Sequence, residues 1–375
     1  MRWESLRIVD LSAGAGGRDG AVGSGATPAL LERGAVTRTF DTPSFRGMTF
    51  FEVHSRSVLN RVPAASRMPF RWTVNPYRGC SHACVYCFAR QTHTYLDLDA
   101  GLDFDSKIVV KVNAAEVLRR ELATPRWTRE HVAMGTNVDP YQRVEGRYAL
   151  MPGIITALTD AGTPFSVLTK GSLVLRDLEL FCAAAHVVDI GVSVSVGSVD
   201  PALWRAVEPG TPSPRARLDV VRAFTRAGIG CAVLMAPVLP HLSDSDEQLE
   251  ATVRAIAEAG ASSLTALALH LRPGAREWWF SWLRANRPEL IKAYEQLYDG
   301  RAYAPAAYQR DLAQRVHKLA ARYQVGRDAP RNRSPWRTGT APRPPVAPHT
   351  AAPTAPIAPI APIAPIAPEQ LPLTF

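Results

Sequence analysis

The chain has 375 residues, of which 46% are hydrophobic, so it can bury a substantial core. No apolar run is long enough to span a membrane, and the start is not typical of a signal peptide, so we expect a cytoplasmic protein with no membrane contact. The net charge of +9 is compatible with a nucleic-acid partner. In a reducing compartment the five cysteines are expected as metal ligands or core residues rather than disulfides.

The two ends of the chain differ in composition from its middle. Residues 1–43 are expected to be flexible, because Gly, Ala and Ser dominate residues 12–27. From Arg337 onward Pro and Ala prevail and form an Ala-Pro-Ile repeat over residues 355–368, which cannot make a ladder of backbone hydrogen bonds. We therefore expect a folded core at residues 44–327 and a disordered Pro/Ala-rich tail at residues 328–375.

Within the core, short apolar runs typical of buried strands alternate with helical patterns. The expected strands span residues 71–75, 108–112, 132–136, 165–169, 187–196, 231–238 and 264–271. The expected helices span residues 114–122, 148–161, 177–185, 214–227 and 246–259, with an aromatic-rich closing region at 277–298. This alternation predicts an α/β fold, a partial or full parallel (β/α) barrel with functional residues at the carboxyl ends of its strands.

Three cysteines crowd into the segment Cys80-Ser-His-Ala-Cys84-Val-Tyr-Cys87, just after the first expected strand. Thiolates are soft ligands that suit iron–sulfur clusters or zinc. Most iron–sulfur clusters use four protein cysteines, so three on one loop would leave one iron open to a small molecule. The alternative is a zinc ion whose four ligands are completed by His82 or His93.

The spacing of three and then two residues between the cysteines, with Tyr86 before the last, resembles the signature of radical S-adenosylmethionine (SAM) enzymes. The resemblance covers about residues 70–285. The stretches Asn75-Pro-Tyr-Arg-Gly-Cys80, Gly135-Thr-Asn-Val-Asp-Pro-Tyr-Gln142 and Leu168-Thr-Lys170 are similar to the branch related to spore photoproduct lyase, and within it to an actinobacterial-type sub-group. Glu208-Pro-Gly-Thr-Pro-Ser-Pro adds to this similarity.

The resemblance implies a 4Fe-4S cluster held by Cys80, Cys84 and Cys87, with SAM as the second cofactor. It also implies an electron donor such as flavodoxin or ferredoxin, and a radical SAM fold. Reductive cleavage of SAM would give a 5'-deoxyadenosyl radical that abstracts a hydrogen atom from the substrate.

Five further residues are expected to contact SAM, each with a plainer alternative. Tyr86 would stack on or edge the adenine, or merely pack under the loop; Asp139 would accept the amine, or only form a turn. Lys170 would neutralise the carboxylate, or be solvated, and Ser195, on the same strand face as Ser193, would bond the ribose. Arg217 would hold the carboxylate bidentately, or form a helix-surface ion pair with Asp219 or Glu208.

The positions of the remaining cysteines bear on the expected substrate. Spore photoproduct lyase uses a cysteine downstream of the cluster as hydrogen-atom donor, whereas here no cysteine lies between Phe88 and Phe181, and Cys182 and Cys231 read as core residues. No catalytic residue is therefore assigned. A DNA lesion is the expected substrate, and the alternatives are RNA, a small molecule, or a non-catalytic zinc-binding adaptor.

The end of the tail, Gln370-Leu-Pro-Leu-Thr-Phe375, resembles the short peptide by which bacterial proteins dock on the DNA sliding clamp. An apolar hook on an extended linker suits such docking, and it would bring the enzyme to DNA. We expect a peptide of residues 367–375 to bind the clamp, measured by isothermal calorimetry. A peptide in which Leu371 and Phe375 are replaced by Ala is the control, and absence of heat with the natural peptide would refute the docking hypothesis.

Overall fold

The computed structural model describes residues 34–63, 66 and 68–330. Its framework is a sheet of six parallel strands that follow one another in chain order: β4 (Trp72–Val74), β7 (Val132–Met134), β8 (Phe165–Thr169), β9 (Ile190–Ser195), β10 (Cys231–Val238) and β11 (Ser263–Ala268). Antiparallel β3 (Leu59–Arg61) extends the β4 edge. Because the sheet ends at β3 and β11, the partial form of the predicted barrel is present, and the α/β prediction is confirmed.

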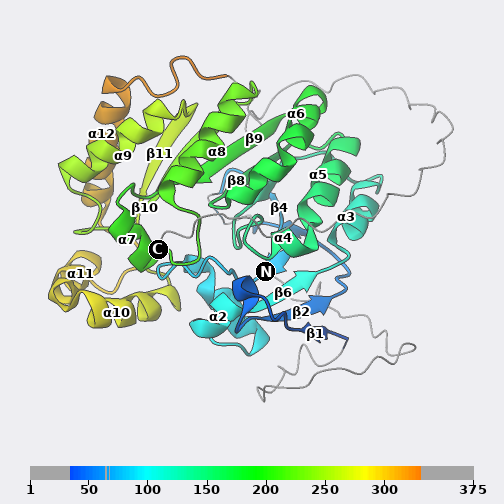
Figure 1. The fold of residues 1–375 in the computed structure, drawn as a ribbon, viewed down its shortest axis with the longest axis horizontal. Helices are drawn as coiled ribbons and strands as arrows, with labels where there is room; N and C mark the ends of the chain where they lie inside the picture. The colour runs from blue at the N-terminus through cyan, green and yellow to red at the C-terminus, as the bar shows by residue number, and fades with distance from the viewer. Residues whose placement is uncertain (1–33, 64–65, 67, 331–375) are drawn as a thin grey trace. The chain divides into compact units, whose positions relative to one another are not determined.

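Helices cover the outer face of this sheet (Figure 1). They are α3 (Ala114–Leu122), α5 (Leu150–Asp160), α6 (Leu178–Val187), α8 (Pro214–Arg226) and α9 (Asp246–Glu258). Fully buried side chains such as Leu118, Ile155, Phe181 and Phe224 pack between these helices and the strands. This core fixes the strand positions and therefore fixes where the loops after the strands lie.

The capping residues at the ends of α8 and α9 explain why the sequence predicted the positions of these two helices. The hydroxyl of Ser213 accepts a hydrogen bond from the backbone N–H of Ala216 at 3.2 Å, and Pro214 occupies the first helical turn. Gly228 then takes a positive φ of 80° after the last turn. Ser245 and Gly260 play the same roles at the two ends of α9.

A second, four-stranded sheet with the order β1-β2-β6-β5 was not foreseen. It comprises β1 (Val36–Arg38), β2 (Thr49–Val53), β5 (Tyr77–Arg78) and β6 (Lys107–Lys111). The strand expected at 108–112 is therefore present but pairs with β2 instead of joining the main sheet. Strand β1 lies inside the stretch 1–43 that was expected to be flexible. It forms because it pairs with residues 50–52 of β2.

Two expected helices are interrupted. Ala149, with a φ of 48°, separates α4 (Glu145–Tyr148) from α5, and Pro288 begins a 3-10 turn, η5 (Pro288–Leu290), between α10 (Ala275–Asn286) and α11 (Ile291–Tyr298). The sequence analysis did not identify α7 (Pro201–Val207) or α12 (Ala306–Arg322). The remaining short elements are α2 (Leu102–Ser106), η2 (Pro43–Phe45), η3 (Phe88–Leu96) and η4 (Ser172–Asp177).

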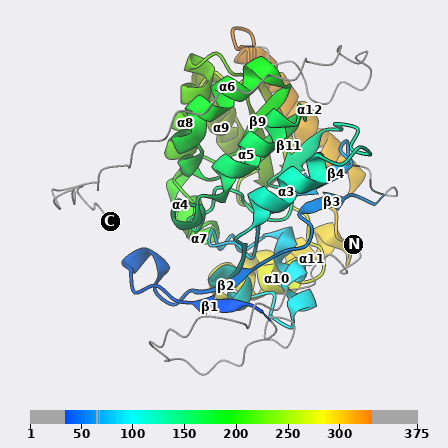
Figure 2. The same cartoon turned by 90° about the vertical axis from the view of Figure 1, so that its right-hand side faces the viewer.

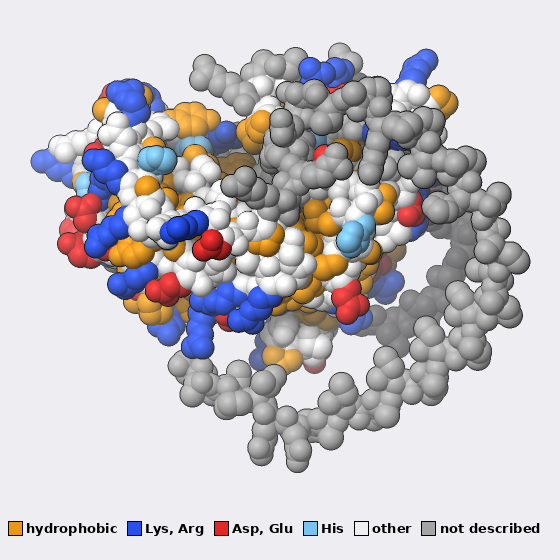
Figure 3. Space-filling model, turned by 90° about the horizontal axis from the view of Figure 1, so that it is seen from above, with side chains coloured by type: hydrophobic (Ala, Val, Ile, Leu, Met, Phe, Trp, Pro, Cys, Tyr) orange, Lys and Arg blue, Asp and Glu red, His pale blue; other side chains and the backbone are white. Residues whose placement is uncertain are grey.

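The four-stranded sheet and α10 and α11 lie at the same end of the molecule (Figures 1 and 2). On the face drawn in Figure 3, Lys and Arg side chains are spread out with Asp and Glu between them. None of the helices in the described part of the chain is both long and apolar enough to cross a membrane. Residues 12–27, the Ala-Pro-Ile repeat and the clamp-like peptide Gln370–Phe375 lie outside the described residues.

Substitutions at two glycines separate the cost in stability of a left-handed backbone conformation from the cost of a steric clash. Gly135 and Gly228 both have positive φ, but a Cβ at Gly135 would lie 1.9 Å from the carbonyl oxygen of Leu168, whereas one at Gly228 would meet nothing within 4 Å. We expect Gly228→Ala to lower the free energy of unfolding by about 1–2 kcal/mol, the cost of the left-handed conformation. Gly135→Ala should lower it by clearly more, measured by urea unfolding, and equal effects would contradict this steric account.

Candidate functional site

The cysteine loop lies between β5 and η3, at the carboxyl end of the parallel sheet. Cys80, Cys84 and Cys87 are free thiols, and the first two are each 7% exposed. All three line one cavity of about 200 Å³, together with residues that lie in the carboxyl-terminal parts of β8, β9, β10 and β11 or directly after β7, β8 and β11. This is the end of the sheet where the sequence analysis expected the functional residues to gather.

Two buried side chains fix the backbone of the loop. The amide of Gln142 donates to the Gly79 carbonyl at 3.0 Å and accepts from the Ser81 N–H at 2.7 Å. The guanidinium of Arg90, which is fully buried, donates to the Cys84 carbonyl from Nε and Nη2 at 3.2 and 2.9 Å. The loop is thus held from both sides by hydrogen bonds that a flexible surface loop would lack.

Arg90 is itself held in place by several groups. Its Nη2 pairs with both oxygens of Asp105, at 2.9 and 3.0 Å, and its Nη1 donates to the carbonyls of Ala100 and Gly101. The guanidinium also lies 4.9 Å from the ring centroid of Trp278. The sequence analysis assigned no role to Arg90 or Gln142, because Arg is usually exposed and neither residue belongs to the cysteine motif.

The donor set fits an iron–sulfur cluster. Burial raises the pKa of all three thiols, and the charge of Lys170 offsets this rise only in part at Cys84 and Cys87, so binding of a metal must displace the thiol protons. Among residues 34–63, 66 and 68–330, no three His, Cys, Asp or Glu side chains are arranged to hold a single metal ion together. In a cluster each thiolate binds a different iron, so the three sulfurs need not meet at one point.

The other two cysteines lie elsewhere. Cys231 begins β10 and is fully buried, and Cys182, on α6, packs against the same core between the sheet and its helices. Neither lines the cavity. His82 lines it, but its Nδ1 lies 3.3 Å from Oδ2 of Asp139, and the Nε2 of His93 bonds the Lys107 carbonyl at 2.9 Å. Both candidate zinc-completing imidazoles are thus engaged with protein oxygens.

Four of the five residues expected to contact SAM line the same cavity: Tyr86, Asp139, Lys170 and Ser195. Lys170 follows the last residue of β8, and its Nζ donates to the Ser195 hydroxyl, at the end of β9, at 2.8 Å. The same Nζ lies 5.8 Å from the ring centroid of Tyr86. The structure therefore brings together residues that are separated by more than a hundred positions in the sequence.

Arg217, the fifth, lies behind this wall. It is 1% exposed, and its guanidinium donates to the carbonyls of Pro212 and Ser195 at 2.9 and 3.0 Å and to the hydroxyl of Thr211 at 2.9 Å. It also pairs with the carboxylate of Glu208. Of its two expected ion-pair partners Glu208 is therefore the actual one, in a buried and not a surface position, while Asp219 pairs with Arg222.

Glu208 joins these residues into one network and was considered beforehand only as a partner of Arg217. Its carboxylate, on a residue 6% exposed, accepts from the hydroxyl of Tyr86 and from Arg217, and Lys170 Nζ lies 3.9 Å away. The loop that carries Glu208 also contacts the cysteine loop directly. Val85 donates to the Val207 carbonyl at 3.0 Å, and Gly210 donates to the His82 carbonyl at 3.1 Å.

Asp139, whose side chain is 10% exposed, is a second carboxylate of the site and lines the cavity itself. It accepts from the backbone N–H groups of Tyr141 and Lys170, at 2.9 and 2.6 Å, and from the Thr169 hydroxyl at 2.5 Å. Burial alone would raise its pKa, but His82 and these hydrogen bonds outweigh burial and lower the pKa below its ordinary value. Asp139 thus forms the turn that was one of its two expected roles and remains an anion in the cavity wall.

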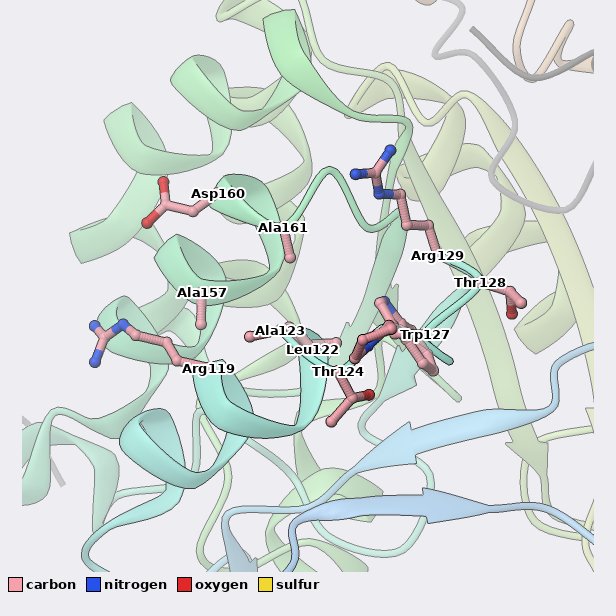
Figure 4. A pocket seen from close by; sticks show the side chains of 11 residues that line it. Arg119, Leu122, Ala123, Thr124, Trp127, Thr128, Arg129, Ala157, Asp160 and Ala161 are labelled. Carbon is pink, nitrogen blue, oxygen red and sulfur yellow. The ribbon is translucent and has the colours of Figure 1, made fainter. Parts of the chain in front are cut away.

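A second hollow, of about 680 Å³, opens between α3 and α5 (Figure 4). Residues 127–129 and 160–161, which line it, precede β7 and β8, so the hollow lies at the amino end of the sheet, away from the cysteines. Of its charged residues, Arg119 and Asp160 lie on one side and Arg129 on the other, and their charged groups do not point at a common centre (Figure 4). It therefore lacks the convergent polar groups of a binding site.

The Glu208 network can be tested through stability. Glu208→Gln removes the charge that faces buried Arg217, and we expect it to lower the free energy of unfolding by about 3 kcal/mol, because a buried cation is left uncompensated. Asp219→Asn is the matched control: it removes the carboxylate of an exposed pair on α8 and should cost less than about 0.5 kcal/mol. Urea unfolding of both variants measures this, and similar losses would contradict the assignment of Glu208 as the central group.

Comparison with known proteins places this geometry in a family. The profile of the radical SAM superfamily matches residues 74–256, which include the cysteine loop and the strands from β7 to β10. An uncharacterised protein of Mycobacterium tuberculosis is 53% identical over 307 residues, which cover 82% of this chain and 90% of the relative. An uncharacterised protein of Mycobacterium bovis matches to the same extent.

Solved structures agree with this assignment. Spore photoproduct lyase complexed with dinucleoside spore photoproduct superposes with a TM-score of 0.57 at 17% identity, over 74% of this chain and 80% of that one. A mutant of that enzyme with bound AdoMet and the dinucleoside gives a TM-score of 0.55 at 17% identity, over 70% and 76% of the two chains. The fold expected from the sequence is confirmed, and the chain belongs to the radical SAM superfamily.

Proposed function

We propose that this protein binds a 4Fe-4S cluster through Cys80, Cys84 and Cys87 and uses it to cleave SAM reductively. The observation that supports this most strongly is the single cavity that joins three free thiols to an anion, a cation and a hydroxyl. When bound, the cluster would supply the electron that breaks the sulfonium bond and so yields a 5'-deoxyadenosyl radical. The residues of the chain bind and orient SAM and exclude water.

The polar wall of the cavity matches the groups of SAM. Lys170 would neutralise the carboxylate, because its side chain is only 15% exposed and its ion-pair partner among the residues described, Glu208, lies 3.9 Å away. Asp139, which keeps its charge, suits the amine. The hydroxyl of Ser195 donates to the Ala236 carbonyl at 2.8 Å and accepts from Lys170, which leaves one lone pair for a ribose hydroxyl.

Tyr86 and Arg217 would act in different ways. The hydroxyl of Tyr86 is held by Glu208, so its ring is fixed at the cavity wall, where it can pack on the adenine. The four hydrogen bonds of the Arg217 guanidinium described above go to protein groups behind the wall. We therefore propose that Arg217 positions Ser195 and Glu208 and does not bind the SAM carboxylate directly.

For the substrate we propose a DNA lesion, which rests on the likeness to a fold that binds a dinucleoside photoproduct and on the net charge of +9. Among the residues described, the only thiols that line the cavity are the three ligands, so we do not propose repair through a donor cysteine. RNA and small molecules are the competing substrates, and flavodoxin or ferredoxin is the proposed type of reductant.

The test is anaerobic reconstitution with iron and sulfide, followed by reduction in the presence of SAM and quantification of 5'-deoxyadenosine. We expect a brown protein that forms it, and we expect Cys84→Ala to lose both bound iron and product. Cys182→Ala is the matched control, because this free thiol lies outside the cavity, and it should retain both. Stimulation of product formation by irradiated DNA, compared with intact DNA and RNA, tests the substrate.

Two outcomes of this experiment would contradict the proposal. A colourless protein that retains zinc and forms no 5'-deoxyadenosine would overturn the proposed activity and leave the zinc-binding adaptor. Equal loss of iron in Cys182→Ala and Cys84→Ala would overturn the assignment of the ligands.

A further inference from the structure

Two exposed aromatic rings lie at the mouth of the cavity. Phe88 directly follows Cys87, lines the cavity and is 41% exposed. Tyr303, in the segment between α11 and α12, is 45% exposed. His270, which follows β11 and also lines the cavity, packs edge-on against Tyr303 with ring centroids 4.7 Å apart. Large exposed rings beside a cavity are typical of a surface that binds something.

Arg272 holds the two rings in one arrangement. Its guanidinium lies 5.2 Å from the ring centroid of Phe88 and 5.9 Å from that of Tyr303, and its Nη2 donates to the Tyr303 hydroxyl at 3.0 Å. The backbones of His270 and Tyr303 are joined by an antiparallel bridge. These four residues, Phe88, His270, Arg272 and Tyr303, form what we call the mouth platform.

Arg272 has no acidic partner in the part of the chain that the structure describes. No Asp or Glu of the described residues forms an ion pair with it, whereas Arg287 and Arg301 in the same region each have one. A cation between exposed rings fits a ligand that offers both a flat π-surface and a negative charge. A nucleotide within a strand has both, as a base and a phosphate.

We propose that the mouth platform binds an unpaired nucleotide of a nucleic-acid strand, with its base on Phe88 or Tyr303 and its phosphate near Arg272. This inference rests on the proposed function and deepens it by naming the form of the substrate. A base inside a duplex is covered by its neighbours on both faces, so only an unstacked or single-stranded base can use such rings. The platform therefore predicts that the enzyme acts on a strand that is locally open.

The test is binding of a dye-labelled oligonucleotide, in single-stranded and duplex form, to the reconstituted protein by fluorescence anisotropy. We expect tighter binding of the single strand, and we expect Phe88→Leu and Tyr303→Leu each to weaken it about tenfold or more, the usual effect of losing one stacking ring. Arg272→Gln should lower the dependence of affinity on salt by about one phosphate contact.

A matched pair elsewhere on the chain provides the control. The guanidinium of Arg322 lies 5.5 Å from the ring of Tyr323, but this pair belongs to the end of α12, next to the amino end of β11, where Gly326 approaches Ser262. Tyr323→Leu should change the affinity less than about twofold. An oligoribonucleotide of the same sequence distinguishes RNA from DNA as the preferred strand.

The outcomes separate this inference from the proposed function, because 5'-deoxyadenosine is measured without nucleic acid in the same preparations. Variants of Phe88 and Tyr303 that form this product normally and bind the single strand like the wild type would overturn the mouth platform alone. Ring-dependent binding by a protein that never cleaves SAM would overturn the proposed function and leave the platform as a nucleic-acid site. Duplex binding that is as tight and as ring-dependent as single-strand binding would refute the requirement for an unpaired base.

Discussion

The buried carboxylate of Glu208 is the group on which the geometry of the site depends. A carboxylate taken out of water destabilises a fold unless cations and hydrogen-bond donors surround it. Arg217, Tyr86 and Lys170 do so here, and they come from α8, the cysteine loop and the end of β8. One charge therefore fixes the relative positions of three segments that are remote in the sequence. The thiols and the polar wall keep their arrangement because these segments cannot shift independently.

Asp139 has a comparable role on the other side of the cavity. It links the turn after β7 to the end of β8 and to His82 in the cysteine loop. The two anions differ in their partners. Asp139 is held mainly by N–H and O–H donors and the imidazole of His82. Glu208 is held by the guanidinium of Arg217 and the hydroxyl of Tyr86. The cavity between them thus has anionic and cationic groups in fixed places, which suits a zwitterionic ligand.

The sequence alone was sufficient to predict those features that depend on a local pattern of residues. The cysteine spacing, the caps of α8 and α9, and polar residues such as Lys170 and Ser195 at strand ends each have a local signal. The contact between Tyr86 and Glu208 spans 122 positions and has no such signal. Arg90 is an example of the same kind, because nothing in a single sequence distinguishes a fully buried arginine from a solvated one. Similarly, the apolar run of β6 reads as a core strand, but its pattern does not tell which sheet it joins.

The open sheet has a consequence for how this site can change during evolution. Because the strands stop at β11, the polypeptide after this strand contributes Leu269 and His270 to the cavity, and helices α10, α11 and α12 share one cluster of buried residues with the cysteine loop. The cysteine loop and the residues proposed to contact SAM lie between β4 and β10 in the chain. Substitutions on the buried faces of these helices can therefore shift the cysteine loop, whereas substitutions at exposed positions such as Tyr303 can reshape the entrance alone. The fold thus couples the packing of the carboxyl-terminal helices to the cysteine loop and leaves the exposed rim of the cavity free to vary.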